Sequence, residues 1–473
     1  MPINKTKIVA TLGPASGNKE MMQKLIEAGV NVFRINFSHS NHSDAEDLIK
    51  IIRDLNIENN GNTAILADLQ GPKLRIGVVE EGAVLEIGDI LTFSPIDEIG
   101  NAKKVFMNYS QFAKDVKVGE RVLMDDGKLV TEVVETDGVE VKAKVIQGGP
   151  LKSKKGVNLP NTKVSLPCLT PKDLADLKIA LKHDVEWIGL SFVRSADDVR
   201  ELRNYIQESG ASSRIISKIE KPEAVIEIDE IIEETDAIMV ARGDLGVEVP
   251  MQGVPLIQKM IVNKCHKMAR PVVIATQMME SMIESMSPTR AEVNDVANSV
   301  LDGADAVMLS GETSVGKYPL TVIEAMSKIV SHVEESGQVQ TESENPPKYK
   351  SNRFITDSIC YNASKIADQV GASAILTMTF SGYTGFKISS HRPKTNIIVF
   401  TANRSILNMV SLIWGVRGFY YDKMESTDST FEEIKQIVKN KNIVSEGDLV
   451  IKIASMPLQN KGTTNMLKIS EIH

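Results

Sequence analysis

A lysine and two carboxylates follow apolar runs of this chain at positions suited to binding a metal and an anion together. Lys218 and Glu220 end the run RIISKIE, and the next run, AIMVARGDLG, leads into Asp244. Residues two apart in a β-strand project to the same side, so Lys218 and Glu220 are expected to face one site. Two carboxylates that leave the remaining positions to water and substrate oxygens suit Mg²⁺ or Mn²⁺. The alternative is a structural ion pair between Lys218 and either acid.

A second set of polar residues alternates along VFRINFSHS, where Arg34, Asn36 and Ser38 share one face of a predicted strand. The guanidinium group of arginine is a planar fork of donors that matches phosphate. The oxygens of Asn36 and Ser38 suit a hard cation. Taken alone, this run is more simply interpreted as a solvated strand end with an incidental arginine. Together with Lys218 and the two acids, it favours a binding site.

Three further strand ends carry polar groups. Asp68 ends AILAD, and Lys73 and Arg75 follow at once; exposed basic residues in a turn are the alternative here. Gly243 lets the backbone approach a ligand closely, and amides at the start of a helical turn can bind a carboxylate. Thr276 follows PVVIA, where its hydroxyl could relay a proton, although simple packing is the commoner role of a β-branched residue.

The spacing of the apolar runs predicts the elements that position these residues. Val- and Ile-rich runs separated by helical patterns such as NKEMMQKLIEAG and VPLIQKMIVNKCHKMA indicate parallel strands covered on both faces. We predict a closed (β/α)₈ barrel, whose active site lies at the C-terminal strand ends. A doubly wound open sheet is the second choice. The predicted strands begin near Thr6, Val30, Thr63, Trp187, Arg214, Ala237, Pro271 and Ala306.

Two further domains are predicted. Between Pro72 and Pro167, alternating runs joined at Asp126-Gly127 and Asp137-Gly138 indicate hairpins, and thus an inserted small β-barrel that acts as a lid. Past a polar linker with Pro346-Pro347, β-α alternation resumes in a C-terminal α/β domain, with predicted strands at SAILTM, NIIVFT and DLVIKIA. The expected domains are 1–71 with 168–345, 72–167, and 346–473.

Composition excludes several classes of function. The 54 basic and 62 acidic residues leave a net charge of −8 without a basic, aromatic-rich stretch, which argues against nucleic acid as the main partner. Neither a membrane-spanning run nor a signal peptide is expected. Three widely separated cysteines predict neither disulfides nor a structural zinc site. These features predict a soluble cytoplasmic protein.

The combined residues favour phosphoryl transfer, in which positioning and charge neutralisation supply most of the catalysis. The chain lacks a Walker-type loop. The same groups would also serve a lyase or aldolase acting on a metal-bound enolate. A catalytically silent metabolite sensor is a third hypothesis, against which the intact Lys218, Glu220 and Asp244 argue. Dependence of turnover on ADP separates the first two hypotheses.

The chain resembles pyruvate kinases along its whole length, in motifs that include KIVATLGPAS, VFRINFSH, DLQGPKLR, ISKIE, MVARGDLGVEVP, ATQMMESM, SGETSVGKYP and GTTNMLK. The resemblance implies a barrel split by a β-rich lid, an effector-binding C-terminal domain and a homotetramer. It implies that phosphoenolpyruvate and ADP yield pyruvate and ATP in glycolysis.

The resemblance also implies roles for individual residues. Glu220 and Asp244 would hold Mg²⁺, while Lys218 and Arg34 would bind the phosphoryl group in transfer. Gly243 and Asp244 amides and Thr276 would hold the substrate carboxylate, and Thr276 would help to protonate the enolate. The nucleotide would face Asn36, His39 and Arg75.

Two regulatory features are expected from the same resemblance. Many family members bind K⁺ at the positions of Asn36, Ser38, Asp68 and Leu69, but this chain has Leu69, Gln70 and Lys73, the pattern of K⁺-independent members. The Lys73 ammonium would replace the ion.

An effector loop would use Thr379, Ser381, Gly382 and Thr384 for one phosphate. Phe380, Tyr383 and the stretch IASMPLQNKG lack the basic residues that a sugar bisphosphate requires.

Overall fold

A closed ring of eight parallel strands forms the centre of the computed structural model, which describes residues 4–339, 353–423, 427–456 and 463–473. The predicted (β/α)₈ barrel is confirmed, and each strand begins within two residues of its predicted start. Around the ring the order is β1, β16, β15, β14, β13, β12, β3 and β2. Their bounds are Lys7–Thr11 (β1), Val32–Asn36 (β2), Ala64–Asp68 (β3), Trp187–Leu190 (β12), Arg214–Ile219 (β13), Ala237–Ala241 (β14), Val272–Ala275 (β15) and Ala306–Leu309 (β16).

Helices cover the outside of this ring because alternate strand residues are apolar on both faces. In β14, Met239 points into the barrel, whereas Ile238 and Val240 pack against the helices. Several helices begin with a capping box, in which a threonine or serine and an acid three residues later satisfy free amides. The helices are Lys19–Ala28 (α1), His42–Glu58 (α2), Pro171–Lys182 (α4), Ala196–Glu208 (α5), Pro222–Ile226 (α6), Ile228–Glu234 (α7), Arg242–Glu248 (α8), Val254–Lys267 (α9), Arg290–Leu301 (α10), Gly311–Ser314 (α11) and Pro319–Glu335 (α12), with 3₁₀ turns at Met251–Gly253 (η1) and Glu280–Ile283 (η2).

The insert between β3 and α4 is built of short strands around its own apolar core. Six strands form one sheet in the order β11, β7, β8, β9, β5 and β6, and β10 pairs with β4. Isolated bridges from Arg75 to Gly156 and from Ile76 to Met107 connect residues 75–76 to both edges of the larger sheet. The elements are Val84–Leu85 (β4), Ile90–Ser94 (β5), Lys104–Phe106 (β6), Phe112–Asp115 (α3), Arg121–Met124 (β7), Leu129–Thr136 (β8), Val141–Gln147 (β9), Gly149–Pro150 (β10) and Val157–Asn158 (β11).

Both predicted hairpins are present. Asp126 and Gly127 have φ values of 57° and 81° in the turn between β7 and β8, and Gly138 has a φ of 83° between β8 and β9. Positive φ is tolerated by glycine and, less readily, by aspartate. The register of each hairpin therefore follows from its Asp-Gly turn.

The C-terminal unit, residues 353–473 as far as described, contains a five-stranded sheet in the order β19, β18, β17, β20 and β21. Its elements are Phe354–Val370 (α13), Ala374–Met378 (β17), Tyr383–Ser390 (α14), Asn396–Thr401 (β18), Arg404–Met409 (α15), Val410–Leu412 (η3), Val416–Tyr420 (β19), Thr427–Asn440 (α16), Leu449–Ala454 (β20) and Met466–Glu471 (β21). The predicted linker at Pro346-Pro347 lies outside the described residues. The three domain boundaries stay predictions.

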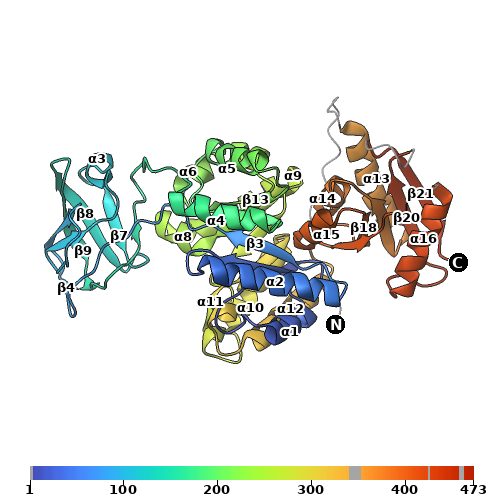
Figure 1. Cartoon of the computed structure of the whole chain (residues 1–473), viewed down its shortest axis with the longest axis horizontal. Helices are drawn as coiled ribbons and strands as arrows, with labels where there is room; N and C mark the ends of the chain where they lie inside the picture. The colour runs from blue at the N-terminus through green and yellow to red at the C-terminus, as the bar shows by residue number, and fades with distance from the viewer. Residues whose placement is uncertain (1–3, 340–352, 424–426, 457–462) are drawn as a thin grey trace.

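The insert and the C-terminal unit lie at opposite ends of the barrel (Figure 1). The C-terminal unit continues the apolar core of the barrel interior, where Trp187 donates to the Met409 carbonyl at 3.3 Å and Lys7 donates to the Val416 carbonyl at 2.9 Å. The carboxyl ends of the barrel strands, where polar residues gather, therefore face the insert. No helix within the described parts of the chain is long and apolar enough to span a membrane.

Candidate active site

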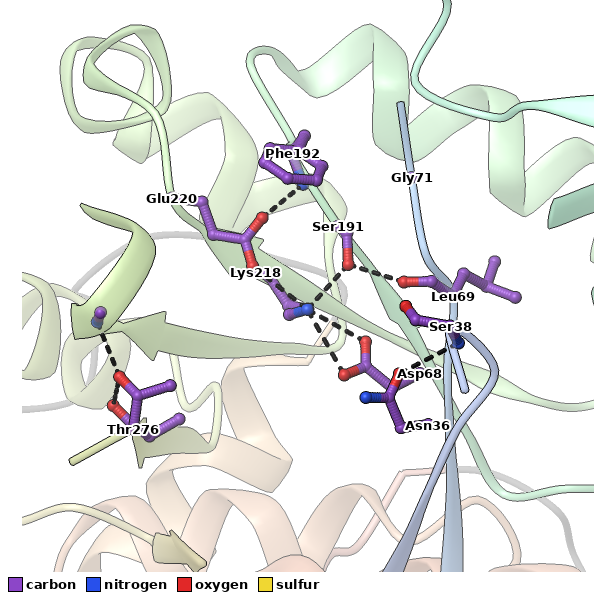
Figure 2. Close-up of polar contacts among 12 residues, drawn as sticks. Asn36, Ser38, Asp68, Leu69, Gly71, Ser191, Phe192, Lys218, Glu220 and Thr276 are labelled. Atoms are coloured by element: carbon purple, nitrogen blue, oxygen red, sulfur yellow. Dashed lines mark hydrogen bonds and ion pairs between the residues drawn. The ribbon is translucent and has the colours of Figure 1, made fainter. Parts of the chain in front are cut away.

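Lys218 lies at the centre of a buried polar cluster at the carboxyl ends of β3, β12 and β13 (Figure 2). Its Nζ atom is 3.1 Å from Asp68 Oδ1 and 3.1 Å from Glu220 Oε1, and it donates to Ser191 Oγ at 2.7 Å. The predicted pair of Lys218 and Glu220 thus faces one site, because Glu220 directly follows β13 and lies two residues after Lys218.

The charges of this cluster shift its pKa values. Burial alone would lower the pKa of Lys218, but the Asp68 and Glu220 carboxylates outweigh it and raise that pKa. Burial also raises the pKa of Glu220; Lys218 opposes this effect and Asp244 adds to it. The pKa of Asp68 is lowered, because Lys218 and Arg34 together outweigh the effect of burial. The site therefore holds a permanent cation among three carboxylates.

Arg34 reaches the same cluster from β2. Its Nε donates to Asp68 Oδ2 at 2.7 Å, a second guanidinium nitrogen lies 2.6 Å from that oxygen, and Nη1 donates to Thr11 Oγ1 at 3.0 Å. Asp68 thus orients both cations that were predicted to meet a phosphoryl group. The structure places Arg34 beside Lys218, as the strand alternation requires.

Glu220 and Asp244 were predicted to hold a divalent cation. Asp244 lies in the first turn of α8, directly after β14, and its charge raises the pKa of Glu220, so the two carboxylates repel each other. Within the described residues, no group of three or more His, Cys, Asp and Glu side chains could hold a metal ion. Two carboxylates with the remaining positions left to water and substrate are what Mg²⁺ usually takes from a protein, so the residues fit such an ion.

Thr276 directly follows β15, and Gly243 lies in the first turn of α8, which follows β14. The Gly243 amide donates to Thr276 Oγ1 at 2.7 Å, and that hydroxyl donates to the Ala275 carbonyl at 2.6 Å. Thr276 has a φ of 71°, which is rare for a β-branched residue and costs roughly 1–3 kcal/mol. The backbone therefore holds this hydroxyl in a strained, defined position.

The predicted nucleotide-binding residues are divided between the barrel and the insert. Asn36 Oδ1 accepts from the Ser38 amide at 3.1 Å, and Arg75 donates to the Lys154 carbonyl at 3.0 Å inside the insert. Burial, followed by the charges of Arg75, Arg34 and Lys73, lowers the pKa of His39. Three basic side chains therefore lie near His39.

The four residues predicted for a monovalent-cation site lie together at the ends of β2 and β3 (Figure 2). The Leu69 carbonyl accepts from Ser191 Oγ at 2.7 Å, and the Asp68 carboxylate is paired with Arg34 and Lys218. Lys73 lies at the start of the insert, and its Cε atom would lie 3.6 Å from a Cβ atom added to Gly156.

Ser191 and Phe192 were missed by the analysis of the sequence. Ser191 Oγ connects Lys218 to the Leu69 carbonyl, and the Phe192 amide donates to Glu220 Oε2 at 2.9 Å. The signal was present, since both residues directly follow the strand WIGL, and polar groups at the other barrel strand ends were taken as candidates.

The predicted effector loop forms the start of α14. Gly382 has a φ of 82°, and its amide donates to Thr379 Oγ1 at 3.0 Å. Thr379, Ser381 and Thr384 line a cavity together with Arg353, whose guanidinium carbon lies 4.1 Å from the centre of the Tyr383 ring. Arg353 is a cation that the sequence analysis did not assign to this loop.

A buried lysine between carboxylates at the mouth of a (β/α)₈ barrel is suited to a phosphotransferase. Family models match residues 3–323 as "Pyruvate kinase, barrel domain" and residues 357–470 as "Pyruvate kinase, alpha/beta domain". The chain belongs to the pyruvate kinase family. It is therefore a phosphotransferase of glycolysis, with phosphoenolpyruvate and ADP as substrates and pyruvate as a product, and the lyase alternative is not favoured.

Two relatives and one solved structure illustrate the similarity. A pyruvate kinase of Corynebacterium efficiens is 42% identical over 466 residues, covering 98% of this chain and 97% of its own length. That of Geobacillus stearothermophilus is 40% identical, covering 99% and 80%. The crystal structure of a pyruvate kinase from Cryptosporidium parvum matches with a TM-score of 0.92 at 35% identity, covering 99% of this chain and 96% of that one. Members of the family generally need a divalent metal.

Proposed function

We propose that Lys218 stabilises the phosphoryl group during its transfer from the enol oxygen of phosphoenolpyruvate to ADP. The observation that carries the proposal is the buried Lys218 ammonium, 3.1 Å from both Asp68 and Glu220 and facing the strand ends. Glu220 and Asp244 would hold the divalent cation (Mg²⁺ or Mn²⁺), which supplies neutralisation of the substrate charges. Preorganised charges of this kind need no reorganisation when negative charge develops.

The remaining steps are assigned to neighbouring residues. Arg34 binds the same phosphoryl group, and the amides of Gly243 and Asp244 with the Thr276 hydroxyl hold the substrate carboxylate. After the phosphoryl group has left, the enolate takes a proton at its methylene carbon, with Thr276 at the end of the proton relay. Asn36, His39 and Arg75 face the nucleotide. The KM for ADP, measured in the Arg75→Met variant, tests this assignment.

A coupled assay with phosphoenolpyruvate, ADP and Mg²⁺ tests the reaction. Pyruvate and ATP should form in equal amounts, and omission of either ADP or the divalent cation should abolish turnover. Pyruvate formation without ADP would instead support the lyase or aldolase hypothesis.

Turnover is expected to be independent of K⁺. A lysine side chain at position 73 is permanently present, so no ion-binding step limits closure of the insert over the site. Burial, followed by the charges of Arg75, Arg34 and lastly Lys73, lowers the pKa of His39, which follows Ser38 directly. A Lys73 charge felt at the end of β2 supports the proposal. The test is turnover at constant ionic strength with K⁺ replaced by a bulky tetraalkylammonium ion; activity should stay nearly unchanged.

Charge reversal at this position provides the complementary test. Lys73→Glu should make the enzyme dependent on K⁺, whereas Lys117→Glu, the same change at an exposed position of the insert, should not. A large loss of native activity without K⁺ would contradict the proposal whatever the variants do.

The C-terminal loop is assigned to one phosphate-bearing effector at most. Thr379, Ser381, Gly382 and Thr384 supply hydroxyls and a turn suited to a phosphate, and Arg353 lines the same cavity. Phe380 and Tyr383 occupy the places where sugar-bisphosphate-activated members carry basic residues. Of the stretch IASMPLQNKG, residues 457–462 lie outside the described part of the chain.

Kinetic titration tests this assignment. Fructose 1,6-bisphosphate should activate weakly or not at all, while any response to a sugar or nucleoside monophosphate should be lost in Arg353→Met. Strong activation by micromolar bisphosphate would refute the assignment. If inorganic phosphate and the monophosphates bind without changing turnover, the loop binds an adventitious anion only.

We propose that the chain forms a homotetramer in the cytoplasm. Both parts of this proposal rest on membership of the family and on its glycolytic reaction, and sedimentation velocity and cell fractionation are the respective measurements.

A further inference from the structure

The short helix that carries Asp244 is held at both of its ends. At the first end, Arg242 of α8 donates two hydrogen bonds of 2.6 Å to Asp295 and one of 2.9 Å to the Thr276 carbonyl. These contacts fix the start of α8 to α10 and to the end of β15.

At the other end of α8, Glu248 forms an ion pair with Lys221. The Lys221 Nζ atom lies 2.6 Å from Glu248 Oε1, and their side chains are only 11% and 1% exposed. The same oxygen accepts from Asn158 Nδ2 of the insert at 2.8 Å. All three residues border the cavity between insert and barrel, which Asp244 also lines.

This ion pair connects the two predicted metal ligands. Lys221 directly follows Glu220, and Glu248 lies four residues after Asp244, about one helical turn away on the same side of α8. A change in the position of Glu248 relative to Lys221 therefore changes the separation of Asp244 and Glu220.

Stability alone does not account for a charged pair here. A buried ion pair often contributes no more than apolar side chains of similar volume, and Glu248 Oε2 is buried without a hydrogen-bond partner among the described residues, which is unfavourable. A directional ion pair nevertheless fixes the position of the end of α8 more strictly than apolar packing does.

We propose that Lys221 and Glu248 are positioning residues for the divalent cation, holding Asp244 at its working distance from Glu220. The proposal rests on the proposed function, in which Glu220 and Asp244 bind that cation. Loss of groups that orient metal ligands typically weakens metal binding 10–100-fold.

The experiment measures Mn²⁺ affinity of the full chain by electron paramagnetic resonance, without substrates. Lys221→Met and Glu248→Gln should each raise the Kd for Mn²⁺ about tenfold. The double variant should lose little more than either single variant, because both changes break one interaction. Lys24→Met, which removes an exposed lysine from an ion pair with Glu20, should leave the Kd unchanged.

Glu220→Gln separates failure of this inference from failure of the proposed function. If Glu220→Gln loses Mn²⁺ affinity while Lys221→Met and Glu248→Gln bind as the native chain does, the positioning role is overturned and the metal site stands. If Glu220→Gln also binds normally, both proposals fall. A lower thermal midpoint with unchanged Mn²⁺ affinity would mean a merely structural pair. Should Lys221→Met not fold, Glu248→Gln, which keeps the shape of the side chain, decides alone.

Discussion

Replacement of Lys218 by methionine is expected to slow phosphoryl transfer by roughly 10²–10³-fold or more. Methionine keeps much of the bulk but removes the ammonium group that lies 3.1 Å from Glu220 and 2.7 Å from Ser191 Oγ. Because the surrounding carboxylates keep Lys218 charged at all working pH values, its loss removes a full positive charge from the path of the phosphoryl group. Initial rates with phosphoenolpyruvate and ADP give the effect directly.

Proton exchange provides the internal control for Lys218→Met. Exchange of the methyl protons of pyruvate with solvent, followed by nuclear magnetic resonance, requires the enolate but no phosphoryl transfer. It should decline less than phosphoryl transfer, and circular dichroism should show a folded protein. Near-native turnover would contradict the assignment of Lys218, and an equal loss of both reactions would point instead to a damaged site.

Replacement of Arg392 by methionine is expected to destabilise the protein by about 3–5 kcal/mol. Arg392 and Asp305 form an ion pair at 2.9 Å between the C-terminal unit and the foot of β16, with side chains 2% and 4% exposed. The guanidinium also donates to the Gly303 carbonyl at 2.7 Å and lies 2.8 Å from His266 Nε2. Burial, followed by the Arg392 charge, lowers the pKa of His266 to about 4, so the ring stays neutral beside the cation.

The reason for the large effect is the carboxylate left behind. Without Arg392, Asp305 would be a buried charge without its cation. The free energy of unfolding, from urea titrations, is the measurement. Arg392→Met combined with Asp305→Asn should recover part of the loss, because it removes both charges and keeps an oxygen that can accept from the Val272 or Trp414 amide. Lys317→Met, which breaks an exposed pair with Glu284, should change stability by no more than about 1 kcal/mol. A native-like midpoint for Arg392→Met alone would contradict the prediction.

Local patterns in the sequence were sufficient for the strands that are apolar on both faces. All eight barrel strands, both Asp-Gly hairpins and the strands β17, β18 and β20 were predicted. Two strands of the C-terminal sheet, β19 and β21, were not. Their sequences, VRGFY and MLKISE, contain charged residues and bury few positions, so they lack the continuous apolar run that identifies a covered strand.

The charged residues of the site could be predicted from the sequence in the same way as the barrel strands. Lys218, Glu220, Arg34 and Asp244 follow apolar runs, and the rule that strand ends of a barrel converge was enough to bring them together. Ser191 and Phe192 satisfy the same rule but contribute a hydroxyl and a backbone amide. A backbone amide is present at every residue other than proline, so no residue type marks its role.

The barrel, the insert and the charged groups at the strand ends could be predicted from the sequence, because strand periodicity and residue chemistry are local properties. The partners of those groups could not, because they depend on the packed fold. Asp68 orients both Arg34 and Lys218. Glu248 contacts Lys221 and Asn158, which come from different parts of the chain. Arg392 contacts Asp305, 87 positions away along the chain. Such pairings depend on how helices, insert and C-terminal unit pack against the barrel, and no spacing along the chain encodes that packing.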